Sequence, residues 1–330
     1  MKPKLLSVPR RFLSTIEDNA LLAPGDRVLV AVSGGADSVC MLDLLRLVRQ
    51  RLGLTLVVFH LNHGLRDLSV RDEEFVRQLC RDWRLEFEVA HSDVAGHARR
   101  YKLGIEEAGR ELRHRQLGRA ADRTDCNRIA LGHTADDNLE TMILNIVRGA
   151  GPNGMAGIRI RRGRFIRPLL DLERKSVEAH LRSRGIDWVE DESNKDRRFR
   201  RNRLRHDVVP VLRELNAQAV TNARRAAAFA ALENDFLDVL ATEAAVRVTR
   251  RAAAGPEIDT AELANYNECL KRRIIKQLLP ELDASAVERV MLFAAAGKPG
   301  RLTLTAGVRA RMVRGFISFE HTQETTSDGR

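Results

Sequence analysis

The hexapeptide SGGADS, at Ser33–Ser38, joins an apolar segment to a helix-like one and carries residue types suited to phosphate binding. Two adjacent glycines let the backbone come close to a ligand, and their N–H groups, the serine hydroxyls and the following helix N-terminus all favour an anion. The pattern fits neither GxxxxGK[ST] nor GxGxxG. It therefore predicts a phosphate loop without lysine, made of Ser33, Gly34, Gly35, Ala36, Asp37 and Ser38.

Asp37 is the unexpected residue of this loop, because a carboxylate repels a bound phosphate unless a cation lies between them. Mg²⁺ suits a site made of carboxylate and phosphate oxygens. We therefore predict that Asp37 is a magnesium ligand and a catalytic residue. The alternative is that Asp37 and Ser38 only cap the helix at a tight turn.

The decapeptide GHTADDNLET, at Gly132–Thr141, brings carboxylates together on one helix. Asp137 and Glu140 are three residues apart and so share a helical face if Thr134 caps the helix. A T-x-x-D cap accounts for Asp137, but Glu140 lies beyond the first turn. Helix capping alone therefore leaves Glu140 unexplained.

Basic residues concentrate between Ser193 and Arg205, where seven of them accompany one acidic residue and Phe199 is interleaved. The seven are Lys195, Arg197, Arg198, Arg200, Arg201, Arg203 and Arg205. A solvated helix face usually mixes the two signs more evenly. We therefore predict that this basic segment contacts nucleic-acid phosphates, with ordinary surface charge as the alternative.

His60 and His63 follow a second strand-like run, and Arg113 lies in an amphipathic helix predicted over Gly104–Leu117. A lone H-x-x-H is weak support for zinc without a third ligand, so a satisfied polar loop is the better alternative for the histidines. An arginine on such a helix is often solvated or paired with a nearby glutamate.

Strand-like runs at Val28–Val32, Leu56–His60, Leu85–Ala90 and Arg128–Leu131 alternate with helix-like segments, which predicts an α/β fold with a parallel sheet covered on both faces. The alternating segment Arg84–Ala90 is typical of an edge strand. The polar clusters follow the strands, where ligands bind in such sheets. From about Asn216 the pattern becomes helical (Gln218–Arg247, Thr260–Leu279, Ala284–Ala296) and ends in short strands, so we predict domains at 1–215 and 216–330.

Composition narrows the class of protein. The chain has 330 residues, 44% of them hydrophobic, and a net charge of +11, which favours a polyanionic partner although an arginine-biased composition is the alternative. No apolar run is long enough for a membrane span and the N-terminal segment does not fit a signal peptide, so we expect a cytoplasmic protein. The four cysteines form no CxxC, which argues against disulfides and zinc.

The SGGADS loop resembles the PP-loop, SGGxDS, of the ATP pyrophosphatases that adenylate a substrate. Further motifs occur in the order seen in the tRNA(Ile)-lysidine synthetase family: HLNHGLR, GHTADDNLET, RGAGPNGMAGI, RPLL and DESNKDRRFRRNRLRHDVVPVL. The resemblance covers about the first 215 residues. It implies ATP and Mg²⁺ as cofactors, free lysine and a tRNA(Ile) with a CAU anticodon as substrates, and a C-terminal domain that binds tRNA.

The same resemblance implies a role for each motif. Asp137 and Glu140 would hold the lysine ammonium, and one of them could accept its proton; Arg113 would lie near the reacting cytidine and phosphates as a catalytic residue. His60, His63, Gly132 and His133 would line the ATP or adenylate pocket. The oligomeric state is not specified, and a homodimer is one arrangement that the family resemblance allows.

Four positions depart from the family pattern, namely Asn138, Gly109, His114 and Met155, and they bear on the cytidine pocket. Two other functions stay open. A related PP-loop thiolase would share the adenylation step, although such enzymes commonly use a CxxC pair or an iron–sulfur cluster. A non-catalytic basic RNA-binding protein is the other, and the intact Asp37, Asp137 and Glu140 argue against it.

Overall fold

The structure, a computed structural model, describes residues 7–62, 69–190, 196–252, 255–305 and 307–321. The chain divides into an N-terminal unit, Met1–Ala230, and a C-terminal unit, Ala231–Arg330. This division falls within the helix α11 (Ala219–Val248). The functional domain boundary at residues 215 and 216 stays a prediction.

The N-terminal unit is built on a six-stranded sheet with the order β3-β2-β1-β4-β6-β5. Its strands are β1 (Arg27–Ala31), β2 (Thr55–Asn62), β3 (Glu86–His91), β4 (Arg128–Ala130), β5 (Arg161–Arg162) and β6 (Phe165–Ile166). Pairing is parallel from β3 through to β6, and β5 joins β6 as an antiparallel hairpin. The predicted parallel sheet is confirmed, and β3 lies at its edge as its alternating sequence indicated.

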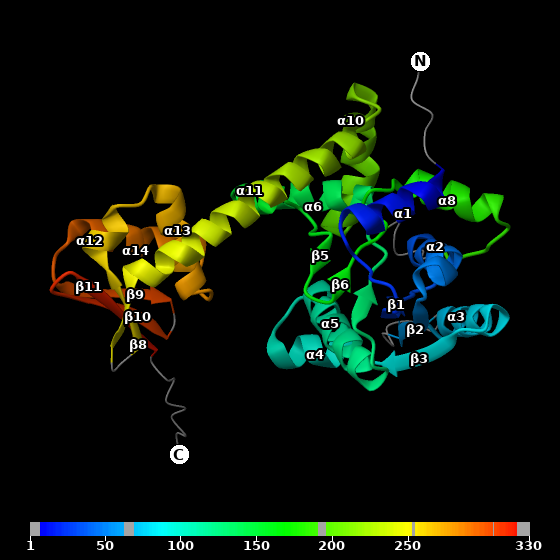
Figure 1. Cartoon of the computed structure of the whole chain (residues 1–330), viewed down its shortest axis with the longest axis horizontal. Helices are drawn as coiled ribbons and strands as arrows, with labels where there is room; N and C mark the ends of the chain where they lie inside the picture. The colour runs from blue at the N-terminus through cyan, green and yellow to red at the C-terminus, as the bar shows by residue number, and fades with distance from the viewer. Residues whose placement is uncertain (1–6, 63–68, 191–195, 253–254, 306, 322–330) are drawn as a thin grey trace. The chain divides into compact units, whose positions relative to one another are not determined.

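Helices connect these strands and cover both faces of the sheet (Figure 1). They are α1 (Val8–Asp18), α2 (Ala36–Leu52), α3 (Ser69–Trp83), α4 (Val94–Tyr101), α5 (Ile105–Arg123), α6 (Ala135–Val147), α7 (Pro152–Met155), α8 (Arg174–Ser183), α9 (Arg200–Arg203) and α10 (Val209–Leu215). A π-helical turn, η2 (Leu204–Val208), joins α9 to α10.

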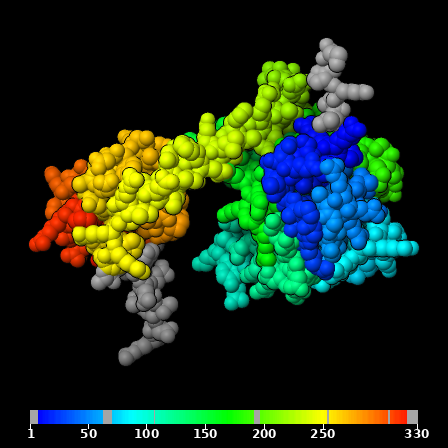
Figure 2. Space-filling view, viewed as in Figure 1, coloured from blue at the N-terminus to red at the C-terminus, as the bar shows by residue number. Residues whose placement is uncertain are grey.

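Alternate residues of the central strand β1 point into two different cores. Val28 and Val30 pack with α1, α2, α3 and α8, whereas Leu29 packs with Leu117 and its neighbours on α5. All three β1 side chains are fully buried, and each contributes roughly 1.5–3 kcal/mol by leaving water. Phe12 of α1 completes the larger core, and Figure 2 shows α1 and α2, in blue, closing that face of the unit.

The C-terminal unit combines part of α11 with three helices and a five-stranded antiparallel sheet of order β7-β8-β11-β10-β9. Its helices are α12 (Thr260–Ala264), α13 (Glu268–Leu278) and α14 (Ala284–Ala296). Its strands are β7 (Thr249–Ala252), β8 (Gly255–Asp259), β9 (Gly300–Thr305), β10 (Val308–Val313) and β11 (Phe316–His321). The predicted helices followed by a small sheet are therefore confirmed in outline.

Two details of this unit differ from the sequence prediction. The helix expected over Thr260–Leu279 is interrupted, because the side chain of Asn267 accepts a hydrogen bond from the backbone N–H of Leu270 and starts a new helix. The strands β7 and β8 were not predicted, since TRRA and GPEID contain few residues that favour strands. They form because each pairs with a neighbour, as Ile258 does with Thr249 and Ile317.

Candidate active site

The phosphate loop follows β1 and is held in shape by its own serines. Ser38 Oγ donates to the carbonyl oxygen of Gly35 at 2.9 Å and accepts the backbone N–H of Ser33 at 3.1 Å. The two serine hydroxyl oxygens are 3.2 Å apart. These bonds join the end of the strand to the first turn of α2, so the loop is fixed before any ligand binds.

Glycine is required at two places around this loop. Gly34 has φ +95°, and a Cβ there would meet Val189 and Phe75 at 3.4 and 3.6 Å. The carbonyl of Gly34 also accepts the N–H of Val189 at 2.9 Å. A Cβ on Gly132 would lie 3.2 Å from backbone atoms of Asp37 and Ser38, so Gly132 lets the end of β4 approach the loop.

Asp37 lies in the first turn of α2 and faces Arg174, the first residue of α8. Its Oδ2 accepts from Arg174 Nη2 at 3.1 Å and Nε at 3.3 Å, while its buried Oδ1 has no hydrogen-bond partner among the described residues. Burial raises the pKa of Asp37 to about 6 although Arg174 opposes the change. A buried carboxylate oxygen without a partner is a candidate ligand position for a cation.

Asp137 uses its two oxygens for different purposes. Oδ2 accepts the backbone N–H and the hydroxyl of Thr134 at 2.8 and 3.0 Å, so the capping interpretation is correct for this atom. Oδ1 accepts from Arg174 at 3.0 Å and Arg201 at 3.2 Å. Burial alone would raise the pKa of Asp137, but Arg174 and Arg201 outweigh it and hold that pKa well below its usual range.

Glu140 lies one turn further along α6 and is only 1% exposed. Its Oε2 accepts from Arg201 Nε at 2.7 Å, and its Oε1 accepts from Arg205 Nε at 2.8 Å. Arg174 is also within 3.9 Å. The carboxylate pair and three arginines therefore form one charged cluster, and Arg174 connects it directly to Asp37 of the phosphate loop.

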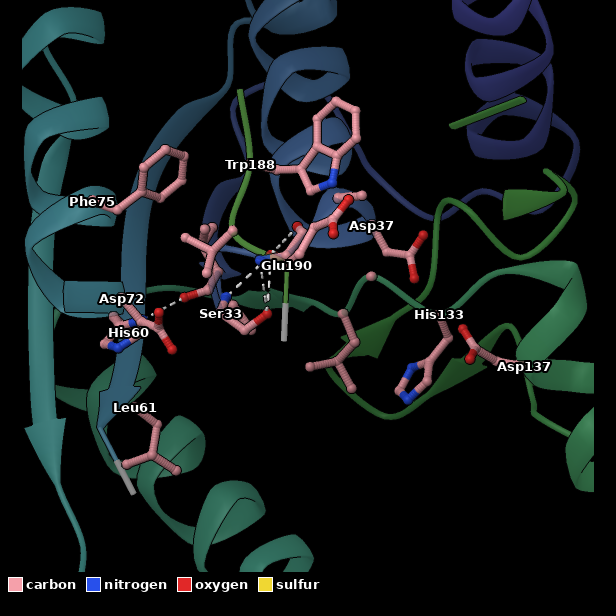
Figure 3. Close-up of a pocket in the computed structure, with 18 of the residues that line it drawn as sticks. Ser33, Asp37, His60, Leu61, Asp72, Phe75, His133, Asp137, Trp188 and Glu190 are labelled. Atoms are coloured by element: carbon pink, nitrogen blue, oxygen red, sulfur yellow. Dashed lines mark hydrogen bonds between the residues drawn. The ribbon is translucent and has the colours of Figure 1, made fainter. Parts of the chain in front are cut away.

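A cavity of about 1410 Å³ opens between the phosphate loop and this cluster. His60 and Phe75 line one side of it, and Asp37, His133 and Asp137 line the other (Figure 3). The volume exceeds that of an ordinary small-ligand pocket, so it can accommodate a nucleotide together with a second substrate.

Burial lowers the pKa of His60 and of His133, two histidines of the site. The strand β2 continues past His60, whose Nδ1 donates to the carbonyl oxygen of Val32 at 2.9 Å, and burial lowers the pKa of His60. Burial, together with nearby arginines, lowers the pKa of His133 to about 3 against the opposing effect of Asp137. His60 and His133 line the cavity, and their contact with a nucleotide stays a prediction; His63 lies outside the described residues.

The arginines of the basic segment point in two directions. Arg201 and Arg205 are four residues apart and point inward to Glu140, while Arg197, Arg198, Arg200 and Arg203 are exposed. Arg197 pairs with Asp207 and Arg198 with Asp196. Lys195 lies outside the described residues. Arg113 also lines the cavity, from α5.

Sequence reasoning missed two parts of the site. Arg174 is the first residue of α8, where its positive charge lies at the positive end of the helix dipole and is unfavourable. An arginine at such a position indicates that carboxylates lie nearby. Trp188, Val189 and Glu190 line the cavity from a segment without regular structure, for which no comparable signal exists.

This site can supply one protein ligand of a magnesium ion. No group of three or more His, Cys, Asp or Glu side chains able to hold a metal occurs among the described residues. Mg²⁺ is, however, usually held by one or two carboxylates together with substrate phosphates and water. The unpartnered Asp37 Oδ1 beside the phosphate loop meets that requirement.

The parallel sheet, the SGGADS turn and the carboxylates beyond the strand ends define a nucleotide-binding protein of the PP-loop class. The PP-loop domain family matches residues 6–212. The solved structure of the U34-tRNA thiolase NcsA from Methanococcus maripaludis, with its 4Fe-4S cluster, has a TM-score of 0.57 and 16% identity. The matched region covers 66% of this chain and 76% of the NcsA chain. At 16% identity, the likeness shows only that the two proteins share a fold.

Curated relatives identify the family more narrowly. The tRNA(Ile)-lysidine synthase of Chlorobaculum tepidum is 34% identical over 95% of this chain and 96% of its own length. The tRNA(Ile)-lysidine synthase of Geobacter sulfurreducens is 39% identical over 79% of this chain. The chain spans only 56% of the length of that relative. The chain belongs to the tRNA(Ile)-lysidine synthase family. Among the described residues, no helix is long and apolar enough to cross a membrane.

Proposed function

We propose that the protein uses ATP to join lysine to carbon 2 of the wobble cytidine in a tRNA(Ile) with a CAU anticodon, giving lysidine. The observation that carries this proposal is one cavity lined by Asp37, Asp137 and Arg174, in which Arg174 pairs with both carboxylates and reaches Glu140, buried behind the lining, at 3.9 Å. The carbon-2 oxygen would attack the α-phosphate of ATP and release pyrophosphate. The lysine ε-amine would then attack carbon 2 and release AMP.

The phosphate loop would hold the ATP phosphates through the backbone N–H groups of Gly34 and Gly35 and the hydroxyl of Ser33, which lines the cavity. Asp37 would hold Mg²⁺ through Oδ1, and the ion would neutralise charge on the phosphates. Arg113 would stabilise negative charge that develops during phosphoryl transfer.

Asp137 and Glu140 would bind the ε-ammonium of lysine. Their oxygens hold guanidinium groups at 2.7 to 3.2 Å, and an ammonium can accept the same carboxylate partners. The α-carboxylate of lysine could in turn pair with an arginine displaced from the cluster, so the exchange would keep the charges balanced. A carboxylate of the pair would accept the proton that the ammonium must lose before it attacks, since its ordinary pKa is near 10.4.

The exposed part of the basic segment would contact tRNA phosphates. Arg200 and Arg203 are exposed, and no ion pair of either is recorded among the described residues, whereas Arg201 and Arg205 are engaged with Glu140. We therefore assign tRNA contact first to the outward-facing arginines. The C-terminal domain, predicted from residue 216 onward, would supply further tRNA contacts, in a cytoplasmic enzyme that could act as a homodimer.

Product analysis tests the proposal directly. The full chain is incubated with a tRNA(Ile) CAU transcript, ATP, Mg²⁺ and lysine, and the wobble nucleoside is analysed by mass. We expect a nucleoside heavier than cytidine by lysine minus water, formed only when lysine is present. A thiolated nucleoside would favour the related thiolase activity, and tRNA binding without pyrophosphate release would favour a non-catalytic RNA-binding protein.

A further inference from the structure

Arg167 is a buried cation whose Nε has no hydrogen-bond partner among the residues that the structure describes. It follows β6 and is 7% exposed. Its Nη1 donates to the carbonyl oxygen of Arg159 at 2.8 Å, while its buried Nε has no partner among the described residues. No carboxylate of the described residues forms an ion pair with it. A buried charge without a counter-ion is costly, so its retention points to an anion that binds there.

Two more arginines lie beside Arg167. Arg162 on β5 pairs in register with Phe165 on β6, two residues before Arg167. The Phe165 ring contacts His114 with ring centroids 4.9 Å apart, and His114 lies one turn beyond Arg110 on α5. These contacts, together with the effect of the Arg110 and Arg162 charges on Arg167, bring the three arginines close together where the β5–β6 hairpin meets α5; the two elements can be followed in Figure 1.

The largest charge effects on Arg167 and His114 come from neighbouring arginines. Burial, together with the charges of Arg110 and Arg162, lowers the pKa of Arg167 to about 10. Burial also lowers the pKa of His114, followed by four arginine charges, among them Arg110, Arg167 and Arg162. The other arginines of the hairpin are engaged elsewhere, since Arg164 pairs with Asp122 and the Arg161 guanidinium donates to backbone carbonyls.

We propose that Arg110, Arg162 and Arg167 bind a phosphodiester of the RNA strand next to the nucleotide that enters the cavity. Arg110 lies three residues before Arg113, which lines the cavity, so the two are about 4.5 Å apart along the helix. A strand that places one base in the cavity would bring its adjacent phosphate to this arginine cluster. The proposal rests on the proposed function, because it assumes an RNA substrate.

Two double variants test the site in the full-length protein. Arg110→Gln with Arg162→Gln removes two exposed charges from the cluster. Arg115→Gln with Arg119→Gln is the matched control, because these residues are exposed on α5 and lie on the side of the helix turned away from Arg110. The tRNA(Ile) transcript is titrated at several salt concentrations, and we expect the first pair to lower the salt slope by roughly one to two units and the control to leave it unchanged.

Other results would overturn the proposal. Unchanged slopes in both double variants, or equal losses in both, would mean that no local phosphate site exists. Inhibition by free phosphate or pyrophosphate is measured in parallel, and its relief in the first variant with an unchanged RNA slope would assign the cluster to free phosphate. If the wild-type chain forms lysidine but the slope does not change, this proposal alone fails; if the wild type makes no product, the proposed function fails.

A third variant, Arg167→Gln, examines the buried member of the cluster. We expect weaker tRNA binding without a lower thermal midpoint, because the replaced charge has no counter-ion to lose. A lower thermal midpoint with unchanged affinity would show that Arg167 only supports the fold. If this variant does not fold, the comparison of the two double variants still decides the proposal.

Discussion

Replacing Glu140 by Gln removes one negative charge from the Asp137 and Glu140 pair, which we propose binds lysine, while keeping the size of the side chain. A charge-assisted hydrogen bond to the lysine ammonium contributes about 1.5–3 kcal/mol. Since 1.4 kcal/mol is a factor of ten, the lysine concentration for half-maximal rate should rise roughly 10- to 100-fold. The ATP requirement should change little, because the described polar contacts of Glu140 are with Arg174, Arg201 and Arg205 and not with the phosphate loop itself.

The fold should tolerate this change. Arg201 and Arg205 would lose their partner on Glu140, but Asp137 remains 3.2 and 3.5 Å from them. Both arginine side chains are partly exposed, which lets water compensate for the missing charge. We therefore expect a loss in the free energy of unfolding of about 1–2 kcal/mol, well below the cost of leaving a fully buried charge alone.

The assay measures the two half-reactions separately. Pyrophosphate release without lysine reports adenylation, and lysidine formation over a range of lysine concentrations reports the second step. Adenylated tRNA should accumulate in the Glu140 variant. Glu86→Gln is the control, because Glu86 forms a 2.7 Å pair with Arg27 at the surface and should leave both steps unchanged. Equal losses toward lysine and ATP would refute the assignment and favour a structural or metal-binding role.

Three further predictions concern the loop and the basic segment. Asp37→Asn should abolish Mg²⁺-dependent adenylation with tRNA affinity nearly intact, and normal pyrophosphate release would exclude the metal role. Changing Arg200 and Arg203 to Ala should flatten the salt dependence of tRNA binding by about one unit per lost contact, whereas an unchanged slope would mean that they face only solvent. Gly132→Ala should weaken ATP binding several-fold in direct binding measurements, because its Cβ would lie 3.2 Å from the backbone of the phosphate loop; unchanged affinity would show that the loop can shift without cost.

The local patterns that the sequence predicts depend on neighbours within a few residues. Val28–Val32 predicts a buried strand because all five residues are apolar and three are the β-branched valine. SGGADS predicts a sharp turn because glycine allows φ +95° at Gly34. Thr134 and Asp137 predict a helix start from their spacing alone, and the capping box is present. These elements, and the end of the sheet at which they meet, follow from short-range chemistry.

The partners of the charged groups depend on long-range packing. Asp37 and Arg174 are 137 residues apart, and Glu140 and Arg205 are 65 apart, so no periodicity in the chain connects them. In the sequence, the seven basic residues between Ser193 and Arg205 look alike. The path of α9 and η2 directs Arg201 and Arg205 inward to Glu140 and leaves the other four described arginines exposed. Likewise, the motif RPLL does not indicate that Arg167 is buried, because its burial depends on the packing of the β5–β6 hairpin beside α5. Residue types and spacing thus determined the fold class and the candidate catalytic motifs, whereas only the tertiary structure decided which charges are neutralised, because ion pairing acts through space between segments distant in the chain.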